Sequence, residues 1–144
     1  GWCRMEEAVL NLVRLGDGRP LLVTQQLLKN GLIGDPAKGK GGALVGNVTS
    51  KVGSVDDNGS GKGYAYRASK AALNIVNKSM SIDLADKNVQ CLLLHPGWVR
   101  TRMTEGRGLI DADESARGLL AAMEGAFGEI NGRWYDYKGD EIPW

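Results

Sequence analysis

Three side chains in the middle of the chain have the chemistry to move a proton to or from a carbonyl or alcohol oxygen: Ser50, Tyr66 and Lys70. Tyr66 and Lys70 lie four positions apart, so on a helix they share one face. A free phenol has a pKa of about 10, and a neighbouring ammonium group favours the phenolate and lowers that pKa. The tyrosine would then exchange a proton with a substrate oxygen near neutral pH, while the serine hydroxyl holds the same oxygen. This set suits interconversion of an alcohol and a carbonyl compound, with hydride supplied by a cofactor.

A long helix must carry the tyrosine and the lysine. Residues 64–85 contain neither glycine nor proline, and their apolar residues recur with helical spacing. These residues form two stripes about 140° apart at 100° per residue. One stripe consists of Ala72, Leu73, Val76, Met80 and Leu84, and the other of Ala68, Ala71, Ile75 and Ile82. We expect one stripe to meet a sheet and the other to meet a helix, either from the same chain or from a second subunit.

Two short apolar runs predict the strands that frame this helix. Residues 43–48 and 89–94 read as buried strands, and Ser50 follows the first of them. A strand, a long helix and a second strand indicate a parallel crossover unit. A further helix over 111–127 and a short strand over 132–137 complete the pattern. The sequence therefore predicts an α/β fold, a Rossmann-type doubly wound parallel sheet with helices on both faces, in which ligands bind beyond the strand ends.

Three stretches in this order resemble the short-chain dehydrogenase/reductase family, and within it the C-factor-type carbonyl reductases. They are Val-Thr-Ser-Lys-Val-Gly at 48–53, Tyr-Ala-Tyr-Arg-Ala-Ser-Lys at 64–70 and His-Pro-Gly-Trp-Val-Arg-Thr at 95–101. The resemblance implies that Tyr66 is the catalytic acid and base and that Ser50 orients the substrate carbonyl. It implies that Lys70 assists Tyr66 and binds the nicotinamide ribose.

The same resemblance implies a cofactor, a substrate and a partner. The cofactor would be NADP or NAD, with NADP preferred, and Tyr66 and Lys70 would contact it. The nicotinamide would be held by the turn that includes Pro96, Gly97, Val99 and Thr101. The substrate would be a small carbonyl compound, covered by residues 103–110. A homodimer would form through the helix at 64–85.

Two departures from the family pattern define the expected domain organisation. The resemblance begins near Pro20, so residues 1–19 are an atypical amino-terminal segment and residues 20–144 match the carboxyl-terminal part of the NAD(P)-binding domain. We find no glycine-rich turn for the cofactor pyrophosphate. The family has an asparagine on the helix before the strand that leads to Ser50, and Asn11 is the nearest candidate for it in this chain. The expectation is a truncated domain, either a reductase or a non-catalytic interaction module or fragment that associates through residues 64–85.

Composition excludes several other classes of protein. The 144 residues include 18 Lys and Arg and 17 Asp and Glu, a net charge of +1 that predicts neither nucleic acid nor membrane binding. The cysteines at positions 3 and 91 form no metal motif, and with one histidine we expect no metal site. No basic start followed by an apolar stretch is present, so we expect a cytoplasmic protein. The stretch at 34–41 resembles a phosphate-binding loop but ends in glycine, and we interpret it as a surface loop.

Overall fold

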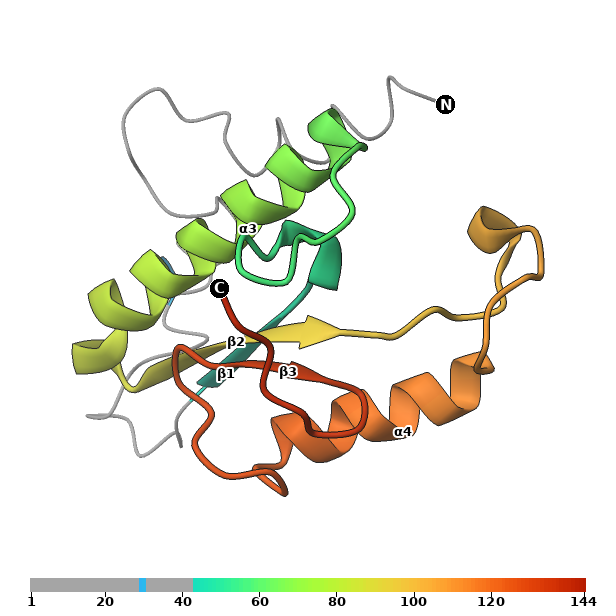
Figure 1. Cartoon of the computed structure of the whole chain (residues 1–144). Coiled ribbons are helices and arrows are strands. Elements are labelled where there is room, and N and C mark those ends of the chain that lie inside the picture. The colour runs from blue at the N-terminus through green and yellow to red at the C-terminus, as the bar shows by residue number, and fades with distance from the viewer. Residues whose placement is uncertain (1–28, 31–42) are drawn as a thin grey trace.

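The computed structural model describes residues 29–30 and 43–144, and its framework is a parallel sheet between two helices (Figure 1). The strands are β1 (Ala43–Val48), β2 (Val89–His95) and β3 (Trp134–Asp136), in the order β1-β2-β3. Both pairings are parallel, with Ala43 opposite Val89 and Leu93 opposite Trp134. The predicted α/β class and parallel strands are confirmed.

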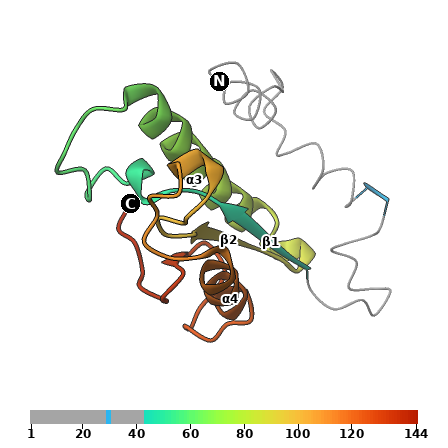
Figure 2. The ribbon, with the colours of Figure 1, turned by 90° about the vertical axis from the view of Figure 1, so that its right-hand side faces the viewer.

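Strand β2 supplies side chains to both layers of the core because successive residues of a strand point to opposite faces. Val89 and Cys91 pack with Met80 and Leu84 on one face. Leu92 and Leu94 pack with Ala122 and Tyr135 on the other. The first face is covered by α3 (Tyr64–Asp83) and the second by α4 (Ala112–Met123), which Figure 2 shows on opposite sides of the strands.

Helix α3 confirms the helix that the two-stripe pattern predicts, and its two stripes have different environments. Leu73 and Met80 of the first stripe are buried against the sheet. Ile75 and Ile82 of the second stripe are 63% and 67% exposed within the part of the chain that the structure describes. The regular helix ends at Asp83, and Ala85–Lys87 form the short 3-10 turn η3.

Helix α4 is shorter than the 111–127 that the sequence predicts. The side chain of Asp111 caps its first turn by accepting a hydrogen bond from the Glu114 amide at 2.7 Å. The helix ends at Met123 because Gly125 takes a left-handed conformation, φ +79°, which reverses the chain soon after. Strand β3 likewise covers only Trp134–Asp136 of the predicted 132–137.

The remaining elements are short and follow β1 and β2. The 3-10 turn η2 (Lys51–Gly53) follows β1, and η4 (Arg102–Thr104) lies in the longer connection after β2. Within residues 29–30 and 43–144, no helix is long and apolar enough to cross a membrane. Residues 1–19, the Asn11 assignment and the loop at 34–41 lie outside the described residues.

Candidate active site

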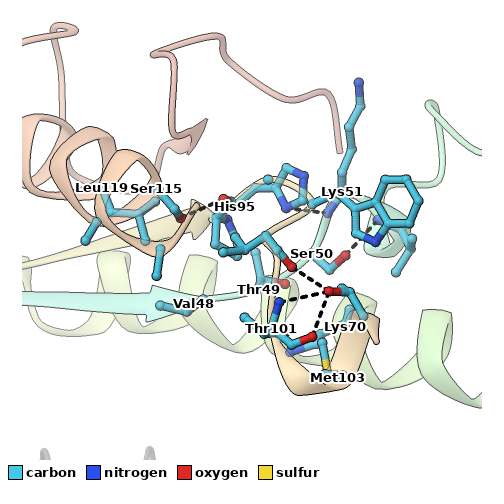
Figure 3. A pocket seen from close by; sticks show the side chains of 18 of the residues that line it. Val48, Thr49, Ser50, Lys51, Lys70, His95, Thr101, Met103, Ser115 and Leu119 are labelled. Carbon is cyan, nitrogen blue, oxygen red and sulfur yellow. Dashed lines mark hydrogen bonds between the residues drawn. The ribbon is translucent and has the colours of Figure 1, made fainter. Parts of the chain in front are cut away.

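The residues singled out from the sequence meet in one cleft at the carboxyl ends of β1 and β2. The cleft has a volume of about 730 Å³. Its lining includes all of the predicted site residues, which are Ser50, Tyr66, Lys70, Pro96, Gly97, Val99 and Thr101. Ser115 and Leu119 of α4 lie at one end of it, and Ser50 and Lys51 lie at the other (Figure 3). The topology therefore gathers predicted site residues that are up to 51 positions apart in sequence, from Ser50 to Thr101.

Ser50 lies where β1 gives way to η2. Its backbone is extended, and its Oγ accepts a hydrogen bond from the Val52 amide at 3.5 Å, so the hydroxyl also caps the turn. The hydroxyl hydrogen is not used by this contact and can be donated toward the cleft. Ser50 thus combines a fixed backbone position with a free donor.

Tyr66 and Lys70 lie in the first two turns of α3 and point into the same cleft. The Lys70 Nζ lies 5.8 Å from the centre of the Tyr66 ring. Burial lowers the pKa of Lys70 from its ordinary value, because the ammonium form loses part of its hydration. In the described residues, neither a carboxylate nor any other hydrogen-bond acceptor pairs with Lys70 Nζ. A half-buried cation without an acceptor is suited to hydroxyl groups of a ligand.

Two hydrogen bonds, one buried and one partly buried, fix the end of β1 and the residue after it against α3, and so fix Ser50 relative to Tyr66 and Lys70. The Thr49 hydroxyl donates to Asn74 Oδ1 at 2.8 Å, and the side-chain Nδ2 of Asn47 donates to Asn77 Oδ1 at 2.8 Å. Asn74 and Asn77 are 4% and 0% exposed. No sequence pattern gave these two residues a role. Their only signal was their position among the buried apolar residues of α3, where polar side chains require partners.

Two further residues that sequence reasoning missed attach the loop after Ser50 to α3. Gly53 packs directly on the helix, since a Cβ at this position would lie 2.8 Å from Lys70 Cβ and from the Lys70 carbonyl carbon. The Arg67 guanidinium donates to the Val52 carbonyl at 3.0 Å. It also donates to the carbonyls of Gly61 and Lys62 and to Ser60 Oγ. The loop and the helix therefore act as one unit.

The turn after β2 forms the opposite wall of the cleft. Gly97 has a φ of +78°, and a side chain there would approach Tyr137 and Ile110 to within 2.9 Å. The buried Ser115 of α4 donates to the Pro96 carbonyl at 2.7 Å. The Val99 carbonyl accepts from Thr104 Oγ1 at 2.7 Å, whereas the Val99 N–H has no acceptor among the described residues. The wall thus presents the Val99 N–H as a free backbone donor, and the exposed Thr101 lies beside it.

His95, the single histidine of the chain, lies at the end of β2 and lines the cleft. Its Nδ1 accepts a long hydrogen bond, 3.4 Å, from the Lys51 amide. Burial has the largest effect on His95 and lowers its pKa. Smaller effects come from the charges of Asp136 and Asp57, which raise the pKa, and from Lys51, which lowers it. A neutral imidazole accepts the amide hydrogen, so this contact favours the unprotonated ring. His95 supports the turn that begins at Ser50.

The donors of the cleft fit a nicotinamide nucleotide, the cofactor that the resemblance implies. Lys70 and the Val99 N–H are donors without acceptors, which hydroxyl and carboxamide oxygens would fill. The ionisable lining residues are Lys51, Tyr66, Lys70 and His95, with no carboxylate to repel an anionic ligand. No metal-binding cluster occurs in the part of the chain that the structure describes.

Comparison with known proteins gives one consistent result. The family model for short chain dehydrogenases matches residues 19–109. The chain is 48% identical over 105 residues to C-signal of Myxococcus xanthus, covering 72% of this chain and 63% of that protein.

Two solved structures extend this similarity to the fold. Carbonyl reductase Sniffer of D. melanogaster matches with a TM-score of 0.66 and 30% identity, covering 77% of this chain and 46% of that one. The NADPH-bound carbonyl reductase from chicken fatty liver matches with a TM-score of 0.62 and 31% identity, covering 71% and 43%. The chain thus spans 63% of the length of its bacterial relative and less than half of each of these reductases.

Proposed function

The chain belongs to the short-chain dehydrogenase family, and from this premise we propose that its cleft interconverts carbonyl compounds and alcohols with NADPH or NADH. One observation carries the proposal: Ser50, Tyr66 and Lys70 converge in a single cleft with the turn from Pro96 to Thr101. The family model and the similarity to two carbonyl reductases support the oxidoreductase class. NADPH is the favoured cofactor because one of these reductases was solved with it.

Each residue has a distinct task in this proposal. The Ser50 hydroxyl donates to the carbonyl oxygen of the substrate and places it beside Tyr66. The Tyr66 hydroxyl gives its proton to that oxygen as the alcohol forms, and takes it back in the reverse direction. Lys70, a cation on the same helix face, stabilises the negative charge that then develops on the phenol oxygen. A nicotinamide held in this cleft would supply or accept the hydride.

The remaining lining residues hold the ligands. Lys70 would donate to ribose hydroxyls, and the Val99 N–H and the Thr101 hydroxyl would bind the carboxamide. Pro96 and Gly97 shape the turn, and the glycine lets the backbone approach closely where a side chain would collide with Tyr137. Trp98 and Met103, both largely exposed, would contact the apolar body of the substrate.

The experiment compares two Tyr→Phe variants on one helix. Tyr66→Phe removes the proton donor, and we expect kcat with NADPH and a panel of aldehydes and ketones to fall about 100-fold or more. Tyr64→Phe is the matched control, because Tyr64 is 85% exposed and does not line the cleft. It should leave kcat unchanged. Equal activity of Tyr66→Phe and the unmodified chain would refute the proposal.

A second candidate function, association without catalysis, is favoured by the outer face of α3. Ile75 and Ile82, two helical turns apart, are mostly exposed in the described structure. We propose that a second copy of this chain covers them. Ile75→Glu should then convert a dimer into a monomer in sedimentation, whereas Ala126→Glu, on the α4 side of the sheet, should not. A monomeric unmodified chain would contradict this candidate.

A further inference from the structure

The last residue of the chain contacts the loop that follows Ser50. We name residues 51–57 the Ser50 loop. The main-chain oxygen of Trp144 accepts hydrogen bonds from the Val55 amide at 3.1 Å, from the Asp56 amide at 2.9 Å and from Ser54 Oγ at 3.2 Å. Ser54 is 3% exposed, and its hydroxyl also accepts from the Asp57 amide at 3.0 Å. Figures 1 and 2 both place the C-terminal end beside η2.

The segment that carries Trp144 is attached to the sheet through Ile142. We name residues 141–144 the C-terminal strap. Ile142 is 4% exposed and packs in the core with Leu93 and Trp134, and its amide donates to the Trp134 carbonyl at 2.9 Å. The Trp144 ring lies 5.9 Å from the Trp134 ring, and Lys78 Nζ of α3 lies 6.0 Å from the Trp144 ring. The strap therefore carries a fixed acceptor to the Ser50 loop.

The Ser50 loop is held from two directions. On one side Gly53 rests on the backbone of Lys70, and Arg67 holds the Val52 carbonyl. On the other side the strap holds Ser54, Val55 and Asp56. Neither Ser54 nor Trp144 lines the cleft, so neither can touch a ligand there. They act only through the loop between them and Ser50.

We propose that the C-terminal strap is a positioning element of the active site. By holding the Ser50 loop against α3, the strap sets where the Ser50 hydroxyl lies relative to Tyr66 and Lys70. The structural half of this statement is independent of catalysis. Its catalytic half rests on the proposed function, since it predicts that the strap raises kcat without binding substrate or cofactor.

Three variants of the full chain test the strap, with one control. A chain ending at Pro143 loses the acceptor and the ring, and Ser54→Ala loses one donor of the set. Trp144→Phe keeps the main-chain oxygen and an aromatic ring, so it is the conservative replacement. Ser79→Ala is the matched control, because Ser79 is exposed on α3 and its hydroxyl donates only to the Ile75 carbonyl.

Two readouts need no activity. Hydrogen exchange of the Val55 and Asp56 amides should quicken about tenfold or more in the chain ending at Pro143, since each loses a hydrogen bond. The imidazole of His95, the only histidine, should titrate closer to its ordinary pKa in the same variant. The reason is that the Lys51 amide moves away from Nδ1 and the ring becomes more exposed to water. Smaller changes in the same direction are expected for Ser54→Ala, and none for Ser79→Ala.

The third readout is kinetic. In the chain ending at Pro143, kcat should fall roughly ten- to a hundred-fold while KM for NADPH stays unchanged. The full-length Trp144→Phe variant should keep most of the kcat of the unmodified chain. Unchanged exchange and unchanged His95 titration would overturn the proposal. So would a loosened loop with an unchanged kcat, because the strap would then be structural only.

Failure of the proposed function is distinguishable from failure of this inference. If the unmodified chain reduces no carbonyl compound, the function fails. The exchange and His95 measurements still decide the strap: quicker exchange together with a shifted His95 titration supports a positioned loop, and the absence of both overturns it.

Discussion

The two loops that line the cleft leave the same edge of the sheet but are held in different ways. The Ser50 loop is fixed from outside by α3 and by the strap, through Gly53, Arg67 and Trp144. The loop after β2 is tied to α4 at its start, where Ser115 donates to the Pro96 carbonyl, and from Val99 to Ile110 it is closed on itself. Val99 pairs with Ile110 as an isolated bridge, and Thr104 Oγ1 binds the Val99 carbonyl. Its outer residues Met103 and Leu109 are 80% and 74% exposed.

This difference matches the tasks that we propose for the two loops. A hydroxyl that must stand within hydrogen-bonding distance of a reacting oxygen gains from rigid attachment. A segment that covers different substrates gains from fewer contacts with the body of the protein. At one edge of the sheet, the rigidly held Ser50 loop thus carries a reacting group, and the loop after β2 covers the substrate.

The largest expected effect comes from adding a methyl group between the Ser50 loop and α3. Gly53→Ala would place Cβ 2.8 Å from Lys70 atoms, so the loop or the helix must shift. We expect a loss of about 1–3 kcal/mol in the free energy of unfolding, measured by urea denaturation. Gly59→Ala is the control, since no atom lies within 4 Å of its Cβ position and its backbone φ is not positive. Equal stability of the two variants would contradict direct packing of the loop on the helix.

Removing the guanidinium of Arg67 should have the next largest effect. Arg67→Met abolishes the hydrogen bonds to Val52, Ser60, Gly61 and Lys62, most of which are exposed to water. We expect a loss of about 1–2 kcal/mol and faster proteolysis within residues 58–63. Arg117→Met on α4, which has no side-chain partner among the described residues, should change neither. Unaltered proteolysis of Arg67→Met would mean that the loop holds its shape unaided.

Thr104→Val tests the other loop and should act there alone. The variant loses the hydrogen bond to the Val99 carbonyl, at a cost of about 0.5–1.5 kcal/mol. We expect KM for the carbonyl substrate to rise while exchange of the Val55 and Asp56 amides stays as in the unmodified chain. Faster exchange of those amides would show that the two loops are coupled. It would contradict the statement that they are held in different ways.

The smallest effect concerns His95 and pH. Burial lowers its pKa in the folded chain, so the unfolded chain binds more protons just below the ordinary pKa of about 6.5. Stability from this residue is therefore present above that pH and is lost as the pH falls through the ordinary value toward the folded one. His95→Gln should be less sensitive to acidification between pH 7 and 5 in thermal unfolding. Identical pH dependence of the two proteins would mean that His95 does not contribute to the loss of stability in acid.

Sequence patterns were sufficient to locate α3, β1 and β2. The helical spacing from Tyr64 onward gave both α3 and the shared face of Tyr66 and Lys70, because that relation is local. The apolar runs gave β1 and β2, and the strand-helix-strand order gave their parallel pairing. The end of α4 was misjudged because Gly125 terminates it through a backbone conformation that no periodicity reveals.

The attachments of the Ser50 loop were not predictable for a different reason. Gly53 touches Lys70 and Trp144 touches Ser54 only after distant segments are packed together, and no spacing rule joins residues 90 positions apart. The tryptophans show the same limit. Trp98 lines the cleft, whereas Trp134 is 1% exposed in the core and Trp144 packs on it, and no sequence pattern separates these positions.

The central claim is that this chain carries a nicotinamide-binding reductase site, and an equilibrium titration tests it most directly. NADPH fluorescence would be followed as the full 144-residue chain is added, and the titration would be repeated with Lys70→Met, whose side chain is similar to lysine in length and volume. The account predicts saturable binding by the unmodified chain and weaker binding by Lys70→Met, because the variant has no donor for the ribose. No binding up to millimolar NADPH, or equal binding by both chains, would contradict it.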